Sequence, residues 1–205
     1  GDIAFLTSGA KTLTLGGTSI GDNIFVPRIT NNTVDSTATA VTVNGGLWIL
    51  NPSVANTYTG VTSVTGGQLR AVDGVGIPTN SPITLNGGVL ELAGASLTRT
   101  LGTAAGNIQL SGGASGFAAG TTSRLVVTLG GSDLTWGGAT FNPTSLVLGS
   151  STALGEAEIT NNINLGSAAR TVTVNNNANT GTMVTAGILS GVLSGIAGGT
   201  LTKSG

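Results

Sequence analysis

The sequence predicts an all-β protein built as a parallel β-helix, and three observations support this fold class. Short runs alternate apolar with hydroxyl residues, glycine pairs recur along the chain, and aromatic residues are limited to two Trp, one Tyr and four Phe. Because a solenoid grows by adding coils to one continuous core, we expect one module over residues 1–205. At the observed repeat length we expect roughly nine or ten coils with uncapped ends.

Four runs have the two-residue period of a half-buried strand. In each run apolar side chains at i and i+2 face one way and threonines face the other. The runs are 11–15 (KTLTL), 40–43 (AVTV), 82–85 (PITL) and 170–174 (RTVTV). Gly-Gly, Asn-Gly and Asn clusters lie between such runs, and we expect them to form the turns.

The spacing of the glycine pairs indicates a repeat. Six of the pairs begin at positions 16, 45, 66, 87, 112 and 130. Three successive units share a phrase, in 44–50 (NGGLWIL), 65–71 (TGGQLRA) and 86–92 (NGGVLEL). Repetition at about 20–25 residues is typical of a solenoid whose units bury their apolar faces on one another.

An antiparallel β-sandwich is the alternative fold, because short strands at regular spacing also suit it. A sandwich core usually needs large aromatic side chains, whereas a narrow β-helix interior takes Leu, Ile, Val, Ala and Thr, which favours the helix. Stacked asparagines can form hydrogen-bonded ladders along such an axis. The candidates are Asn44, Asn86, Asn162 and Asn175. Strands stack at about 4.8 Å, which predicts a rod on the order of 45 Å long.

The segment 56–60 (NTYTG) carries a family resemblance. With 46–50 (GLWIL) before it and 64–69 (VTGGQL) after it, it resembles the autotransporter-associated β-strand repeat. The sequence departs from the family pattern where Leu47 directly precedes Trp48, at Pro52, and in the missing second glycine after Gly60. Further phrases, including 88–92, 97–102, 134–137, 146–150, 163–166, 189–195 and 199–205, are similar to long modules of large bacterial surface proteins.

This resemblance implies a structural role. It implies a module of an extracellular fibre or a cell-surface adhesin, located outside the bacterial cell and stacked end to end with its own kind. In the family, a segment such as 201–205 (LTKSG) runs into a further repeat. We therefore expect one repeat of a longer array or one subunit of a filament. A glycan-binding passenger adhesin and, less favoured, a carbohydrate-active β-helix enzyme are the alternatives.

Composition argues against several function classes. The net charge is −1 and charged residues make up 7% of the chain, so there is no basic patch for nucleic acid or anionic lipid. No apolar run has the ~18 residues of a membrane helix. The chain has no cysteine and no histidine, which removes disulfides, thiolate ligands and the commonest general base. We expect no enzyme activity, no cofactor and no catalytic or metal site.

The residues that could carry chemistry also have ordinary structural explanations. Tyr58 and Trp48 could stack on sugar rings, but such aromatics more often fill gaps between coils. Glu156 and Glu158 share a strand face about 6.6–6.8 Å apart, which loosely suits a glycosidase pair. A solvated strand face is the favoured interpretation, since no other carboxylate or base joins the pair in sequence.

Metal binding and covalent cross-linking have weak support. The aspartates are scattered and form no calcium loop, with residues 130–133 (GGSD) the nearest fragment; they are Asp2, Asp22, Asp35, Asp73 and Asp133. Residues 198–203 (GGTLTK) lack the helix that a phosphate-binding loop needs. Lys11 or Lys203 could form a cross-link to an asparagine side chain, but that requires a buried trio with a carboxylate, and the sequence cannot establish one.

Overall fold

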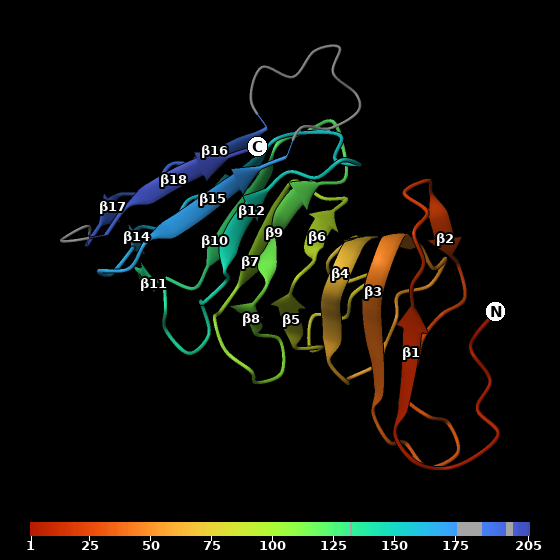
Figure 1. Cartoon of the computed structure of the whole chain (residues 1–205). Coiled ribbons are helices and arrows are strands. Elements are labelled where there is room, and N and C mark those ends of the chain that lie inside the picture. The colour runs from red at the N-terminus through yellow and green to blue at the C-terminus, as the bar shows by residue number, and fades with distance from the viewer. Residues whose placement is uncertain (132, 176–185, 196–198) are drawn as a thin grey trace.

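The computed structural model describes residues 1–131, 133–175, 186–195 and 199–205, and these form strands and connecting segments without a helix. Every pairing between named strands is parallel. Figure 1 shows the chain winding in one direction, from the N-terminal strands at one end to the C-terminal strands at the other. The prediction of an all-β parallel β-helix is confirmed, and the antiparallel sandwich is excluded.

One long sheet runs the length of the molecule. Eight of its eleven strands follow one another in hydrogen-bonded order. They are β1 (Lys11–Leu15), β3 (Thr39–Leu50), β4 (Thr62–Ala71), β6 (Val89–Leu92), β9 (Ala114–Ala119), β12 (Ser145–Leu148), β15 (Arg170–Val174) and β18 (Leu201–Ser204). The other three, β2 (Asn23–Phe25), β5 (Ile83–Asn86) and β8 (Ile108–Gly112), extend single levels of this sheet.

Two smaller sheets form further walls, and their strands begin at residue 96. The first contains β7 (Ser96–Arg99), β10 (Leu125–Leu129), β13 (Ala157–Ile159) and β16 (Gly187–Leu189). The second contains β11 (Leu134–Thr135), β14 (Ile163–Asn164) and β17 (Leu193–Ser194). The coils that begin with β1, β3 and β4 therefore return mainly through loops, whereas the coils that begin with β6, β9, β12 and β15 return through strands of the smaller sheets.

Coil length, read from residues that face each other on neighbouring coils, changes along the axis. Near the start, Arg70 lies opposite Glu91, and these register partners are 21 residues apart. Farther on, the hydrogen bond from Leu129 N to the Asn161 side chain joins neighbouring coils at positions 32 residues apart. The expected nine or ten coils assumed short coils throughout, whereas the long sheet has eight levels because the first coil and most of the later coils are longer. Eight levels at about 4.8 Å make a rod of roughly 38 Å.

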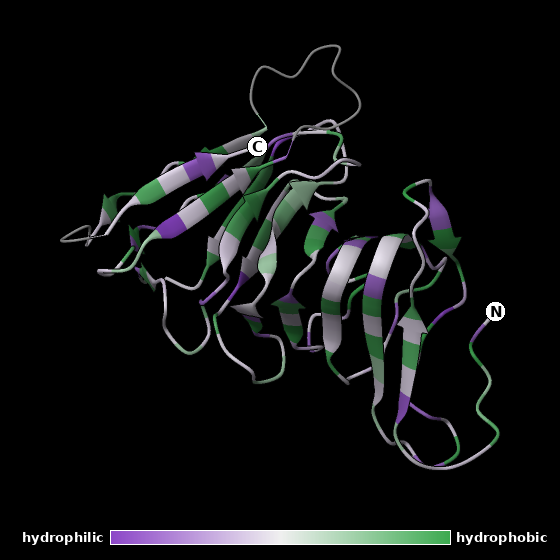
Figure 2. Cartoon of the chain, in the orientation of Figure 1, coloured by the Kyte–Doolittle hydropathy of each residue, from purple (hydrophilic) through white to green (hydrophobic). Residues whose placement is uncertain are grey.

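The interior is a continuous apolar column. Val41, Val64, Leu85 and Leu110 are fully buried at successive levels and belong to one cluster that extends to Val172 near the C-terminus. Figure 2 shows hydrophobic and hydrophilic residues alternating along several strands, and the burial of alternate residues in β10 (Leu125–Leu129) places the apolar side chains inside. On the outside, hydroxyl groups bond from coil to coil.

One such column of hydroxyls joins three levels near the C-terminal end. Ser145 Oγ lies 2.6 Å from Thr173 Oγ1, and Thr173 Oγ1 lies 3.0 Å from Ser204 Oγ. Each contact links neighbouring strands of the long sheet, because Ser145, Thr173 and Ser204 lie on β12, β15 and β18. These three hydroxyls therefore form a polar, uncharged column on the outward face.

The glycine pairs were expected to be turns, and for two of them that is wrong. Gly45-Gly46 and Gly66-Gly67 lie inside β3 and β4, where the register shifts at a bulge. Gly46 and Gly67 have φ angles of 67° and 69°, a conformation that L side chains rarely adopt. The bulge lets one strand bend round a corner without breaking its hydrogen-bonded ladder.

The asparagines that tie coils together are mostly not those predicted. Asn44 and Asn86 are exposed, and Asn175 is half-buried. Asn162 is exposed but does link coils, since its Oδ1 accepts from Val192 N at 2.7 Å. A buried link on both sides is made by Asn56, whose Oδ1 accepts from Ile29 N at 2.7 Å while its Nδ2 donates to Gly76 O at 2.8 Å. This single amide bonds to the coil before it and the coil after it.

Candidate functional site

The two aromatic residues considered for sugar binding belong to the fold. Tyr58 is fully buried, and its hydroxyl lies 2.7 Å from Thr62 Oγ1. Burial raises the pKa of Tyr58 to about 12, against the opposing hydrogen bonds from Thr62 and Ser81. Trp48 is partly buried against the core and donates from Nε1 to Gly16 O at 3.1 Å. Tyr58 therefore cannot stack on a sugar, and the gap-filling interpretation is correct for it.

The carboxylate pair of the enzyme alternative is held by an arginine. Arg124 Nε donates to Glu156 Oε2 at 2.9 Å, and Arg124 Nη1 donates to Glu158 Oε2 at 3.1 Å. Hydrogen bonds from Ser190 and then Arg124 keep the pKa of Glu158 below its ordinary value. A glycosidase acid needs a raised pKa, so this geometry suits a link between neighbouring coils rather than proton donation.

The aspartates are dispersed among different partners. Asp2, Asp22 and Asp73 face Arg28, Arg70 and Arg99 respectively. Asp35 accepts from Thr37 and from Gly9 N, and these hydrogen bonds, with Lys11 nearby, lower the pKa of Asp35. Asp133 accepts from Asn162. Over the described part of the chain no three acidic side chains come together to hold a metal ion.

Neither lysine lies in the buried trio that a cross-link needs. Lys11 Nζ donates to Thr7 Oγ1 at 2.9 Å and to Ser8 O at 2.8 Å, at an exposed position. Lys203 Nζ donates to Gly205 O, also at the surface. Both side chains therefore bond to nearby groups at the surface of the two ends.

The most buried charged group was not predicted from the sequence. Glu91 on β6 is fully buried on the outward side of the long sheet, and its Oε2 accepts from Arg70 Nε at 2.9 Å. Its Oε1 accepts hydrogen bonds from the hydroxyls of Ser150 and Thr152. The only sequence signal is that Arg70 and Glu91 occupy the same place in two successive repeats, where they are register partners.

The segment 149–155, which we call the strap, folds back over the outer face of the long sheet. Leu154 N donates to Ala119 O at 2.8 Å, and Thr152 O accepts from Arg70 Nη2 at 2.6 Å. Ala153 of the strap completes a second, smaller apolar cluster with Val89, Ala118 and Val147, outside the main core. The strap thus buries an apolar part of the outer face that would otherwise be exposed.

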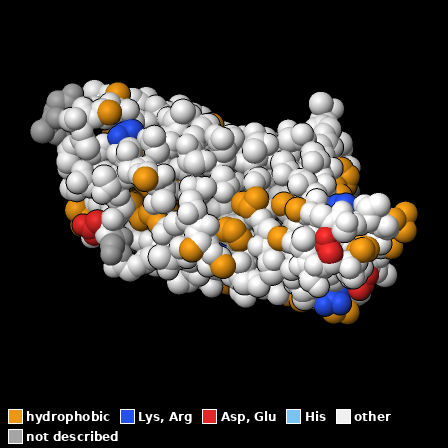
Figure 3. All heavy atoms as spheres, turned by 90° about the horizontal axis from the view of Figure 1, so that it is seen from below, with side chains coloured by type: hydrophobic (Ala, Val, Ile, Leu, Met, Phe, Trp, Pro, Cys, Tyr) orange, Lys and Arg blue, Asp and Glu red, His pale blue; other side chains and the backbone are white. Residues whose placement is uncertain are grey.

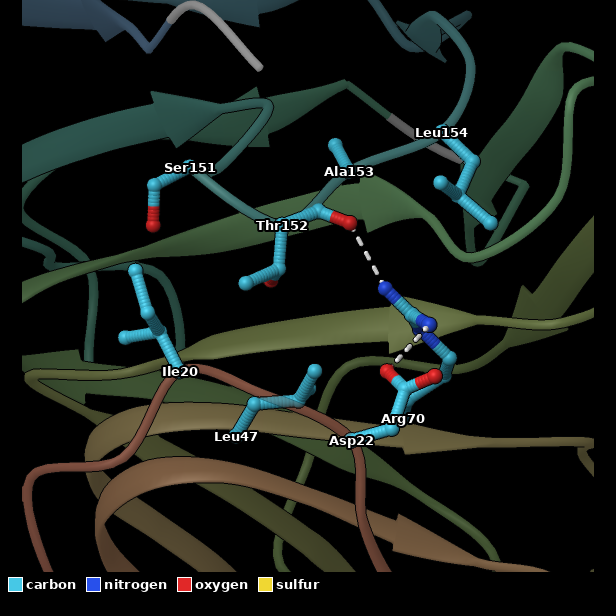
Figure 4. Close-up of a pocket in the computed structure, with 8 residues that line it drawn as sticks. All are labelled: Ile20, Asp22, Leu47, Arg70, Ser151, Thr152, Ala153 and Leu154. Atoms are coloured by element: carbon cyan, nitrogen blue, oxygen red, sulfur yellow. Dashed lines mark hydrogen bonds and ion pairs between the residues drawn. The ribbon is translucent and has the colours of Figure 1, made fainter. Parts of the chain in front are cut away.

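A pocket of about 280 Å³ lies where the strap meets the N-terminal loops. Figure 4 shows the Arg70 guanidinium between the Asp22 carboxylate and the carbonyl of Thr152. Ile20, Leu47, Ala153 and Leu154 supply an apolar lining. Because Arg70 is bonded to Glu91 and Thr152 and paired with Asp22 at 3.5 Å, the arrangement is best explained as a brace between coils.

The two ends of the long sheet form a different candidate site. β1 pairs only with β3 at one end, and β18 pairs only with β15 at the other, among the residues that the structure describes. Each terminal strand therefore presents a row of unpaired backbone N–H and C=O groups. Such an edge is a template for another strand.

The N-terminal end is also apolar at its surface. Large hydrophobic residues are more than half exposed in this first coil, and they are Leu6, Ile20, Ile24, Val26 and Val34. Figure 3 shows apolar side chains gathered at the same end of the molecule. An exposed apolar group of this kind, beside an unpaired edge, marks an interaction surface.

Comparison of the chain with family models, with curated proteins and with solved structures finds no match. The resemblance to the autotransporter-associated repeat thus stays a prediction from the sequence. Across the described residues no helix is long and apolar enough to cross a membrane.

Proposed function

We propose that the protein is a structural module of an extracellular fibre or cell-surface adhesin, and that it assembles end to end with copies of itself. The observation that carries this proposal is the pair of unpaired, parallel edge strands at opposite ends of one sheet. A strand edge of this kind is satisfied by another edge of the same direction.

The rest of the molecule supports a passive, stiff role. The interior is one apolar column over the length of the rod, and hydrogen bonds between neutral groups join neighbouring coils at several levels. A chain without cysteine or histidine and with 7% charged residues has few groups that respond to redox state or moderate pH change. These properties suit a surface module outside the cell.

The test is electron microscopy of the purified protein over a range of concentrations. We expect filaments with an axial repeat of roughly 38 Å, the height of eight levels. The matched variants are Thr12→Pro and Thr12→Val, on the free edge of β1. Proline removes one N–H from that edge and is tolerated on edge strands, so Thr12→Pro should abolish filaments and Thr12→Val should retain them. A protein that stays monomeric at every concentration would contradict the proposal.

A further inference from the structure

The backbone groups of the two terminal strands point in opposite directions along the axis. Inward-facing residues donate to the next coil, as Val41 N does to Val61 O and Arg170 N does to Thr200 O. Outward-facing residues donate to the preceding coil, as Asn175 N does to Leu148 O. Because of this alternation, the free edge of β18 presents the backbone N–H and C=O groups of its inward-facing residues. The free edge of β1 presents the backbone N–H and C=O groups of its outward-facing residues. The two edges are complementary head to tail.

The only two lysines of the chain lie at inward positions on these two strands. Lys11 faces the same side of β1 as Leu13, and Leu13 pairs with the buried Val41. Lys203 pairs with Val172 of the main core. Both side chains lie at the surface because no further coil covers these strands. A charge at an inward position of an edge strand disfavours pairing at that edge, so only a register that leaves each ammonium group a path to solvent can form.

The alternation of inward and outward residues allows only registers that differ by two residues. Leu201 opposite Lys11 places all four residues of β18 against β1. In a second register Leu201 lies opposite Leu13. Ser204 then has no partner in β1, because β1 ends at Leu15. In a third register Lys203 lies opposite Lys11, and only two residues of β18 pair with β1. This register also places two like charges opposite each other, which destabilises a strand pair.

Resting on the proposed end-to-end assembly, we propose that β18 of one copy pairs in parallel with β1 of the next in a single register, with Leu201 opposite Lys11. Lys203 then lies opposite Leu13, so each lysine stem packs on a leucine of the other copy while its ammonium group reaches solvent. Ser204 lies opposite Thr14, which extends the hydroxyl column of Ser145, Thr173 and Ser204 into the next copy.

The charges of the two ends agree with this partner. Residues 1–38 carry three aspartates and two basic residues, and residues 171–205 carry Lys203 as their sole charged side chain. Counted over side chains alone, the two ends carry −1 and +1, so a second copy meets each end with side chains of the complementary sign.

Cysteine cross-linking tests the register, because the natural chain has no cysteine. Thr12→Cys in one copy and Thr202→Cys in another would place two cysteines opposite each other at about 4.8 Å, within disulfide reach. Thr202→Cys mixed with Thr14→Cys, and Ser204→Cys mixed with Thr12→Cys, report the two shifted registers. For each pair, the two single variants are mixed, and one of them carries a mass tag. The mixture is oxidised mildly, and mass spectrometry then measures the disulfide-linked mixed dimer.

We expect several-fold more mixed dimer from the Thr12 and Thr202 variants than from either shifted pair. Preferential cross-linking of a shifted pair would overturn the register while the end-to-end assembly stands. The third outcome is that no pair gives more mixed dimer in native buffer than it gives in urea, and that sedimentation shows monomers. This outcome would overturn both the register and the proposed assembly.

Discussion

The N-terminal and C-terminal halves of this β-helix complete their coils by different means. In the N-terminal half the return path is a set of loops tied by side chains, above all the Asn56 amide and the buried Tyr58. In the C-terminal half the return path consists of the two smaller sheets. The short early coils spend 12 residues on β3 and 10 residues on β4, which leaves too few for two more strands. Coil length thus decides whether side chains or backbone close the wall.

The two halves are joined on the outside by the Arg70–Glu91 brace. Arg70 lies in the N-terminal half, and the strap that contacts it comes from a level three strands farther along the sheet. The brace therefore couples regions with different construction. The predictions below test this coupling and then the separate construction of the N-terminal half.

The largest effect is expected from Arg70→Met, which leaves the buried Glu91 carboxylate without its cation. Breaking a buried pair in this way costs about 3–5 kcal/mol of unfolding free energy. The double variant Arg70→Met/Glu91→Leu should recover most of the loss, because it removes both charges. Urea denaturation measures both values.

The same variant shows whether the halves unfold together. Trp48 lies in the N-terminal half and Trp136 in the C-terminal half, so Trp136→Phe and Trp48→Phe backgrounds give one fluorescent reporter each. With the brace intact the two urea transitions should coincide, and with Arg70→Met they should separate. Coincident transitions in the Met variant would show that the brace does not couple the halves.

The bulge of the N-terminal half is tested by Gly67→Ala. A Cβ at Gly67 would lie 2.3 Å from Gly46 O, at a φ of 69°, so we expect a loss of about 2 kcal/mol or more. Gly94→Ala is the matched control, because no atom lies within 4 Å of a Cβ built there. Equal stability of the two variants by thermal denaturation would show that the bulge can relax.

The neutral Tyr58 hydroxyl predicts an alkaline transition in the N-terminal half. The pKa of Tyr58 is about 12 in the folded protein and about 10 in an unfolded chain. Because the folded-state pKa is the higher, this stability is fully present below pH 10 and is lost as pH rises towards 12. Tyr58 is the single tyrosine, so phenolate absorbance reports it alone.

Tyr58→Phe serves as the control for that titration. It should cost about 1 kcal/mol at neutral pH through the lost hydrogen bond to Thr62. It should also remove the loss of stability attributable to ionisation above pH 10. A phenolate that titrates near pH 10 in the folded protein would contradict the burial of this residue.

The smallest effect is expected from Thr39→Val in β3. The Thr39 hydroxyl is buried and has no hydrogen-bond partner among the described residues. Valine has the same shape without the oxygen, so we expect a gain of about 1 kcal/mol. Thr62→Val is the contrast, because the Thr62 hydroxyl bonds to Tyr58 and Ser81 and its removal should destabilise the protein. Calorimetry compares the two.

The strands that the sequence predicted best are those with strict alternation. The runs 11–15 and 170–174 match β1 and β15 residue for residue, because alternation reports which side of a strand is buried. The glycine pairs showed the period but not their role, since the same Gly-Gly serves a turn or a bulge. Nothing around Glu91 in the sequence showed its burial, which depends on hydroxyls of the distant strap.

The sequence by itself determined the all-β class, the parallel winding and the absence of histidine and cysteine chemistry, because period and composition are local properties of a chain. The tertiary structure decided which groups meet: Asn56 rather than Asn44 links the coils, Tyr58 turns inward, Arg70 braces the strap, and both lysines lie on end strands. These outcomes depend on register between distant coils, and a shift of two residues in register would preserve every local pattern while changing each of them.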